Sequence, residues 1–171
     1  MQQAVMMYMQ EDLCHAARLD VPVLISGSAA DDSGSLAQLI HRTSRRAAGR
    51  FIDFSCAGKP AAQLEAALFG SVRAACAVLA HAPGGLLEQA HGGTLFLADV
   101  DAISLDLQVR LLEFLDSGKI RRVGADRAHT IASVRMITST RRELIGDVRR
   151  NRFREDLYYR LNVIHLVGDA G

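Results

Sequence analysis

The sequence predicts an α/β fold in which helices cover both faces of a parallel sheet. Short apolar runs, typical of buried strands, alternate along the chain with segments in which apolar residues recur at helical spacing. The length of 171 residues, 49% of them hydrophobic and 23% charged, suits one globular domain with its own core. In such a fold, ligands bind at the carboxyl ends of the strands.

The first part of the chain predicts two strands among three helices. Gln2–Leu19 contains neither Gly nor Pro and is predicted as a helix. The apolar run Val21–Ile25 ends at Ser26-Gly27, which indicates a buried strand followed by a turn. Leu36, Leu39 and Ile40 recur at helical spacing and predict a helix to about Arg46. A second strand over Phe51–Phe54 and a helix over Ala61–Phe69 follow.

The second part of the chain predicts three more strands. Thr94–Ala98 is a buried strand that begins after two glycines. Apolar residues from Leu107 to Leu115 form one stripe of a helix, with Ser104 as its N-cap and Gly118 at its C-terminal end. The other predicted elements are strands over Ser133–Ser139 and Val163–Val167 and a helix over Phe153–Leu161, and the segment 70–85 is ambiguous.

Charge and composition exclude several classes of protein. The net charge of +1 argues against a strongly electrostatic binder of nucleic acid or membranes, and no apolar run is long enough to span a bilayer. Cys14, Cys56 and Cys76 are widely spaced, which favours reduced thiols in a cytoplasmic protein. The six histidines form no metal-binding pattern, so we expect no metal site. Lys59 and Lys119 are the two lysines of the chain.

Several stretches between Val21 and Val163 make the chain resemble the AAA+ domain of bacterial sigma-54-dependent transcription regulators of the NtrC type. The resemblance implies a three-layer, P-loop NTPase-like core with a parallel five-stranded sheet. It also implies an ATP- and magnesium-dependent ring that remodels RNA polymerase carrying sigma-54. The stretches that carry the resemblance are Ile40-His41, Leu68-Phe69-Gly70, Gly92–Leu97, Gln108 with Leu111-Leu112, Arg122-Val123-Gly124 and Phe153–Val163.

The phosphate-binding loop of this family has a counterpart that departs from the expected pattern. A P-loop needs glycines for close approach of the backbone to the phosphates, and a lysine that contacts them. In register with the family, the lysine position is Ser33, the preceding glycine position is Asp32, and Gly34 follows. We therefore expect a degenerate Walker A loop over Gly27, Ser28, Ala29, Ala30, Asp31, Asp32, Ser33 and Gly34.

The catalytic positions of the family also differ here. The resemblance places Ala98 at the metal-linked Asp of the Walker B motif and Asp99 at its catalytic Glu, and Asp99 with Asp101 nearby is an alternative metal-linked acid. Arg141 stands at the sensor position, where relatives have Asn. It is either an exposed loop residue or a cation that pairs with Asp99 or Asp31 and mimics a bound state.

Of two further family features, the sigma-54 contact loop is altered in this sequence and the arginine-finger positions are retained. The sigma-54 contact loop is replaced by an apolar segment without its glycines, Phe and Thr, so we do not expect the usual contact. Arg154 and Arg160 match the arginine-finger positions, and they either bridge to a neighbouring subunit or pack the Tyr158-Tyr159 region. The altered contact loop comprises Ala74, Ala75, Cys76, Ala77, Val78 and Leu79.

Seven of the 18 arginines lie between Arg141 and Arg160, interspersed with acids, which indicates a solvated or intersubunit face more than a nucleic-acid patch.

We expect residues 1–171 to form one AAA+ core, without the helical lid, receiver or helix-turn-helix domains of relatives. It would act through protein contacts, with impaired ATP turnover and no bound cofactor. The alternatives are an active ATPase that drives sigma-54 polymerase in a full-length ring, and a basic module that binds nucleic acid or a regulatory protein.

Overall fold

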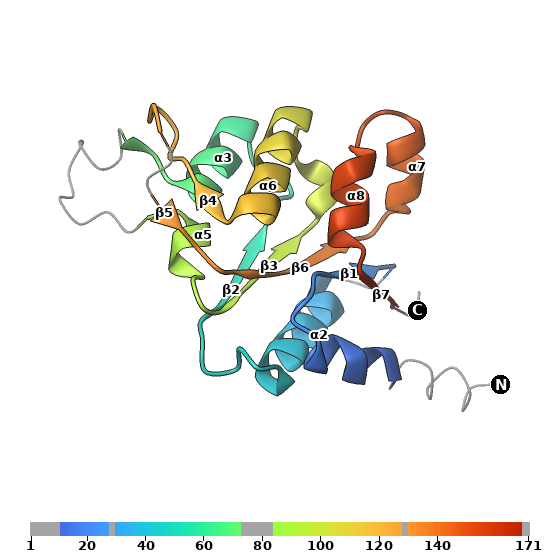
Figure 1. Ribbon diagram of the computed structural model, residues 1–171. Helices are drawn as coiled ribbons and strands as arrows, with labels where there is room; N and C mark the ends of the chain where they lie inside the picture. Colours follow the sequence, from blue (N-terminus) through green and yellow to red (C-terminus); the bar gives the residue numbers. More distant parts are fainter. Residues whose placement is uncertain (1–10, 28–29, 73–83, 128–129, 169–171) are drawn as a thin grey trace.

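A computed structural model of the chain describes residues 11–27, 30–72, 84–127 and 130–168. Five strands form one sheet in the order β2-β3-β6-β1-β7, and every neighbouring pair is parallel (Figure 1). The predicted five-stranded parallel sheet is therefore confirmed. The strands are β1 (Val23–Ser26), β2 (Phe51–Ser55), β3 (Thr94–Ala98), β6 (Arg135–Thr140) and β7 (Ile164–Val167).

Helices cover both faces of the sheet, which gives three layers (Figure 1). One face carries α2 (Ala30–Thr43) together with a helical segment over residues 11–18. No helix in the described ranges is long and apolar enough to cross a membrane. The opposite face carries α3 (Ala61–Phe69), α5 (Leu86–Gln89), α6 (Leu105–Ser117), α7 (Leu144–Arg149) and α8 (Glu155–Leu161).

The alternation of side chains along each strand divides the interior into two cores. In β3, Leu95 and Leu97 belong to the core beneath α3, α6 and α8, whereas Phe96 and Ala98 belong to the core beneath α2. All five residues of β3 are buried, which explains why this strand reads as an uninterrupted apolar run. The two cores hold the carboxyl ends of the strands in a fixed arrangement.

The capping residues predicted for α6 are found at both ends of the helix. The Ser104 hydroxyl accepts a hydrogen bond from the Leu107 amide at 3.4 Å, and Gly118 ends the helix in the left-handed conformation at φ 69°. His41, on α2, is buried and forms a 2.9 Å hydrogen bond between its Nδ1 and Oγ1 of Thr94. This histidine is therefore a packing residue that ties α2 to the start of β3.

Several short elements were not predicted. They are α5, α7, the 3-10 turn η1 (Val100–Ala102) and the antiparallel hairpin of β4 (Lys119–Ile120) and β5 (Thr130–Ile131). Each has too few residues to display a period. The helix predicted from Phe153 begins two residues later, because Phe153 is buried in the core and Arg154 occupies the N-cap. The altered contact loop at 74–79 and most of the ambiguous segment lie outside the described residues.

Candidate functional site

The ends of β1, β3 and β6 meet at one edge of the sheet, because parallel strands finish on the same side. Gly27 follows β1 at φ 77°, and its amide donates to the Thr140 carbonyl at the end of β6, 3.2 Å away. A side chain at position 27 would be strained in this left-handed backbone. The predicted turn between β1 and α2 is therefore present, and it is tied to the neighbouring strand.

The second half of the predicted phosphate loop lies inside helix α2, which begins at Ala30. Ser33 is 1% exposed, and its hydroxyl donates to Oγ of Ser139 in β6 at 3.4 Å. Asp32 is exposed. Ser28 and Ala29 lie outside the described residues, and the side chains of Ala30 and Asp31 are likewise not described.

Asp99 directly follows β3 and adopts the left-handed conformation with φ 55°. Its two carboxylate oxygens have different partners. Ser55 Oγ, at the end of β2, donates to Oδ2 at 3.2 Å, and Arg141 Nε, after β6, donates to Oδ1 at 3.2 Å. The Asp99 side chain is 15% exposed and that of Arg141 is 65% exposed. Arg141 therefore contacts Asp99, one of the two acids suggested as its partners, while the side chain of the other, Asp31, is not described.

A parallel arrangement surrounds the second acid, Asp101. The Thr140 hydroxyl donates to Asp101 Oδ1 at 2.8 Å, and Arg142 Nε lies 3.7 Å from Oδ2. The sequence named Asp101 as a nearby acid, but it did not single out Ser55, Thr140 or Arg142. A small polar residue at a strand end carries no distinctive sequence signal, so these partners became visible only in the structure.

Ala98 and Cys56 are buried at the ends of β3 and β2, next to these acids. Ala98 is 7% exposed, and its carbonyl accepts a hydrogen bond from the Cys56 amide at 2.9 Å. Burial, reinforced by the negative charge of Asp99, raises the pKa of the Cys56 thiol to about 12. Cys56 is therefore a neutral thiol at physiological pH. In the described part of the chain, no group of three or more His, Cys, Asp or Glu residues is arranged to hold a metal ion.

The two arginine-finger positions lie at the N-cap of α8 (Arg154) and within it (Arg160), and each has an acid partner. Arg154 forms a two-pronged ion pair with Asp156, from Nε at 3.0 Å and from Nη2 at 2.7 Å, and this contact lowers the pKa of Asp156. Arg160 Nη2 lies 3.1 Å from the Leu115 carbonyl and 3.0 Å from Asp116. These are surface contacts, with 41% of the Arg154 and 49% of the Arg160 side chain exposed.

Gln108, one of the residues that carries the resemblance, fixes the start of α8. Its amide nitrogen donates to the carbonyls of Ile103 at 3.0 Å and Arg152 at 3.1 Å, and its oxygen accepts from the Arg154 amide at 2.8 Å. Gln108 is fully buried, so these bonds satisfy groups that water does not reach. Through them, α6 determines where Arg154 leaves the core.

This strand order, with a glycine turn between β1 and α2, defines the chain as an α/β core of the P-loop NTPase class. A solved P-loop NTPase domain of a sigma-54 activator from E. coli has the same fold at TM-score 0.65 and 18% identity, covering 98% of this chain and 95% of that one. The model of the Sigma-54 interaction domain family matches residues 1–167. The chain belongs to the Sigma-54 interaction domain family, and the predicted resemblance is confirmed.

Two curated relatives at about 40% identity are named as regulatory proteins. The Nif-specific regulatory protein of Klebsiella pneumoniae is 41% identical over 86% of this chain, and the transcriptional regulatory protein GlrR of Escherichia coli (strain K12) is 42% identical over 88%. NtrX from Brucella abortus, solved in complex with ADP, has a TM-score of 0.84 at 30% identity over 95% of this chain. The chain spans 28%, 34% and 35% of the lengths of these three proteins.

Proposed function

We propose that this chain is the AAA+ core of an NtrC-type regulator in which ATP binding and hydrolysis are impaired, and that it acts through protein contacts. The observation that carries the proposal is the residue at position 33. The family's register puts the phosphate lysine there, whereas this chain has a serine that is 1% exposed and lies 3.4 Å from Ser139 Oγ. The loop from Gly27 to Gly34 contains no Lys or Arg in its sequence.

The charge of the loop opposes a phosphate chain. Relative to a P-loop, the loss of one lysine and the gain of Asp31 and Asp32 change the local charge by three units toward negative. Two unit charges about 4 Å apart interact by roughly 1 kcal/mol in bulk water and by about 4 kcal/mol at the effective dielectric of a protein surface. Placing these carboxylates against the triphosphate therefore lowers the affinity for ATP considerably.

The strand ends also fit magnesium and a reacting phosphate poorly. Ala98 has no oxygen in its side chain with which to hold a metal. The carboxylate of Asp99 is already bound by Ser55 and Arg141, at 3.2 Å each. A guanidinium that occupies Asp99 offsets the negative charge on which a metal ion would depend. The residues present therefore do not fit ATP with magnesium in the manner of the family.

The altered segment at 74–79 supports the second part of the proposal. It lacks the glycines, Phe and Thr of the sigma-54 contact loop in its sequence, which argues against the usual contact with sigma-54. Arg154, at the N-cap of α8, and Arg160, within this helix, are retained and partly exposed. A partner AAA+ subunit, or a second copy of this chain, is the kind of protein that these arginines would engage.

Isothermal titration of the 171-residue chain with ATP and magnesium tests this proposal. We expect no micromolar ATP binding that strengthens with magnesium. The variant Asp32→Gly/Ser33→Lys/Ala98→Asp, which returns the family residues, should gain micromolar binding. A matched control, Gln38→Lys, adds one lysine to an exposed position on the same helix and should gain no binding.

Micromolar binding by the unaltered chain that strengthens with magnesium would refute the impairment and favour the active ATPase instead. An equal gain in the Gln38→Lys control would show that added charge, and not the loop, determines binding. A gain confined to the triple variant would support the proposal that these three positions account for the loss.

A further inference from the structure

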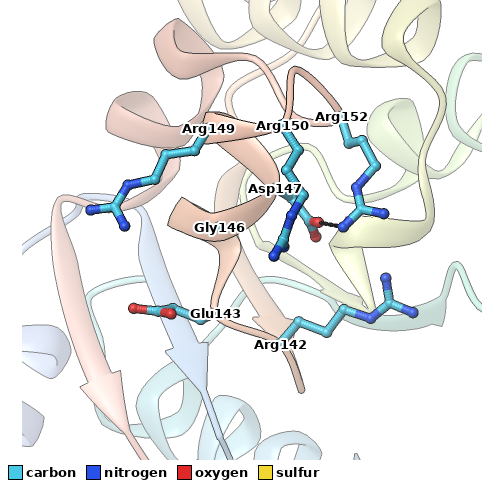
Figure 2. Close-up of a pocket in the computed structure, with 7 residues that line it drawn as sticks. All are labelled: Arg142, Glu143, Gly146, Asp147, Arg149, Arg150 and Arg152. Carbon is cyan, nitrogen blue, oxygen red and sulfur yellow. Dashed lines mark hydrogen bonds and ion pairs between the residues drawn. The ribbon is translucent and has the colours of Figure 1, made fainter.

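Helix α7 and the loop after it border a cavity of about 550 Å³ that the function proposed above does not use. Four arginines line it, Arg142, Arg149, Arg150 and Arg152, with Glu143 and Asp147 as the acids (Figure 2). Its volume is within the range of small-molecule sites, which are roughly 300–1,000 Å³. All the lining residues come from one short stretch of chain, so local backbone geometry sets their arrangement.

A turn at the end of α7 builds one wall of the cavity. Asn151 adopts φ 55°, a left-handed conformation that Asn tolerates better than most residues, and its amide donates to the Val148 carbonyl at 3.0 Å. The chain then turns back, so that the Arg152 amide donates to the Asp147 carbonyl at 2.9 Å. Asp147 is 5% exposed, and its carboxylate accepts from Arg152 Nη2 at 2.6 Å. Arg152 is thereby held in place (Figure 2).

The other arginines divide into one paired residue and two unpaired ones. Arg142 lies 3.7 Å from Asp101 at the opposite end of the helix. Within the described part of the chain, Arg149 and Arg150 form no ion pair. The head group of Arg150 lies against Gly146, since a Cβ added at Gly146 would be in van der Waals contact with Arg150 Nη1 at 3.4 Å. Two guanidinium groups therefore line the cavity without an acid partner.

We propose that this arginine pocket binds a linear polyphosphate chain, either free or as the phosphate tail of a nucleotide. Guanidinium groups donate paired hydrogen bonds to phosphate oxygens, and they remain charged at every physiological pH. Arg149 and Arg150 supply the unpaired donors, while Asp147 holds Arg152 at another side of the same cavity. A chain of several phosphates has the charge density to compensate two cations and to overcome Glu143.

The lining distinguishes a phosphate chain from a nucleic acid. The residues that line the cavity include no aromatic side chain, so the cavity offers no surface on which a base would stack. The cavity is also concave and confined to the vicinity of a six-residue helix, whereas a duplex is contacted along an extended basic surface. The net charge of the chain, +1, supplies no broad field for DNA.

The inference is independent of the impaired P-loop, because the two sites have different residues. The test is titration of the 171-residue chain with inorganic tripolyphosphate, without magnesium, at low and at moderate salt. We expect saturable binding that weakens at least tenfold in Arg149→Gln/Arg150→Gln. The matched control, Arg121→Gln/Arg127→Gln, removes two exposed arginines elsewhere and should change the dissociation constant less than twofold.

Parallel titrations with ATP and AMP distinguish the two sources of phosphate. If ATP binds, AMP does not, and ATP binding is lost in Arg149→Gln/Arg150→Gln, then the pocket holds the phosphate tail of a nucleotide. If tripolyphosphate binds and ATP does not, then the ligand is free polyphosphate. The absence of tripolyphosphate binding at low salt, equal weakening in both double variants, or preferential binding of a DNA duplex through the same arginines would overturn the proposal. If the double variant does not fold, as judged by circular dichroism, the two single variants answer the same question.

Discussion

Cys56 lies directly after β2, fully buried beneath the carboxylate of Asp99. Because burial and the nearby negative charge raise its pKa from 9.0 to about 12, the thiolate fraction at pH 8 falls about a thousandfold. We predict that iodoacetamide at pH 8 labels the exposed Cys14 at least a hundredfold faster than Cys56. Peptide mapping by mass spectrometry at timed intervals measures both rates in the same sample.

Unfolding in urea should remove this difference, because the pKa of Cys56 then returns to that of an ordinary thiol. The pKa of Cys56 is higher in the folded than in the unfolded protein, so native Cys56 should still be largely unreactive when the pH is raised from 8 to 9. Comparable rates for the two thiols in the folded protein would contradict the burial and the electrostatic arrangement around Asp99.

A second prediction at the residue scale compares two ion pairs of different exposure. Arg141→Gln removes the partner of Asp99, but the arginine side chain is 65% exposed, so the free energy of unfolding should fall by less than about 1 kcal/mol. Asp147→Asn weakens a 2.6 Å bond made by a buried carboxylate, and we expect a loss of roughly 1.5–3 kcal/mol. Urea denaturation of both variants gives the comparison, and a larger loss in Arg141→Gln would contradict it.

At the same scale, the sequence predicted which residues follow the strands more accurately than it predicted the side-chain contacts between those residues. Asp99 and Arg141 were foreseeable as neighbours because each follows a strand of one parallel sheet. The contact with Asp99 follows from the order β2-β3-β6-β1-β7, which places β6 directly beside β3. Ser55 could not be foreseen as the second partner, since β2 had no place in the sheet until the strand order was known.

At the scale of elements, the glycine pair before β3 offers a matched test. A Cβ at Gly93 would overlap the backbone nitrogen and oxygen of Arg50, whereas a Cβ at Gly92 would meet nothing within 4 Å. Gly92 has φ 76°, so Gly92→Ala costs only the left-handed strain of about 1–2 kcal/mol. We predict that Gly93→Ala destabilises the protein by roughly 3 kcal/mol or more, because β2 and β3 must separate locally. Thermal and urea denaturation measure both, and equal losses would refute this reading of the packing.

The same elements show which patterns carry structural information. The five residues of β3 were predicted with the bounds that the structure gives, because two glycines precede an unbroken apolar run. Helix α6 was predicted because its stripe, its serine cap and its terminal glycine agree. In contrast, β4 and β5 have two residues each, and α7 has six with arginines beside them, so neither apolar spacing nor capping marks them.

At the scale of the whole molecule, the two proposals predict opposite responses of thermal stability to two phosphate ligands. A ligand present at 100 times its dissociation constant stabilises the folded state by about 2.7 kcal/mol, which raises the melting temperature of a domain of this size by roughly 5–10 °C. With an impaired P-loop, 1 mM ATP with magnesium should leave the melting temperature within about 1 °C, unless the arginine pocket holds the nucleotide tail.

Tripolyphosphate should instead raise the melting temperature by several degrees in the unaltered chain and in Arg121→Gln/Arg127→Gln, but not in Arg149→Gln/Arg150→Gln. Differential scanning fluorimetry of all three proteins with both ligands provides the measurement. A rise with ATP and magnesium that persists in Arg149→Gln/Arg150→Gln would refute the impaired P-loop and leave the pocket untouched. A rise with tripolyphosphate that persists in that variant would refute the pocket and leave the P-loop proposal standing, because position 33 and α7 contribute separate residues to the two sites.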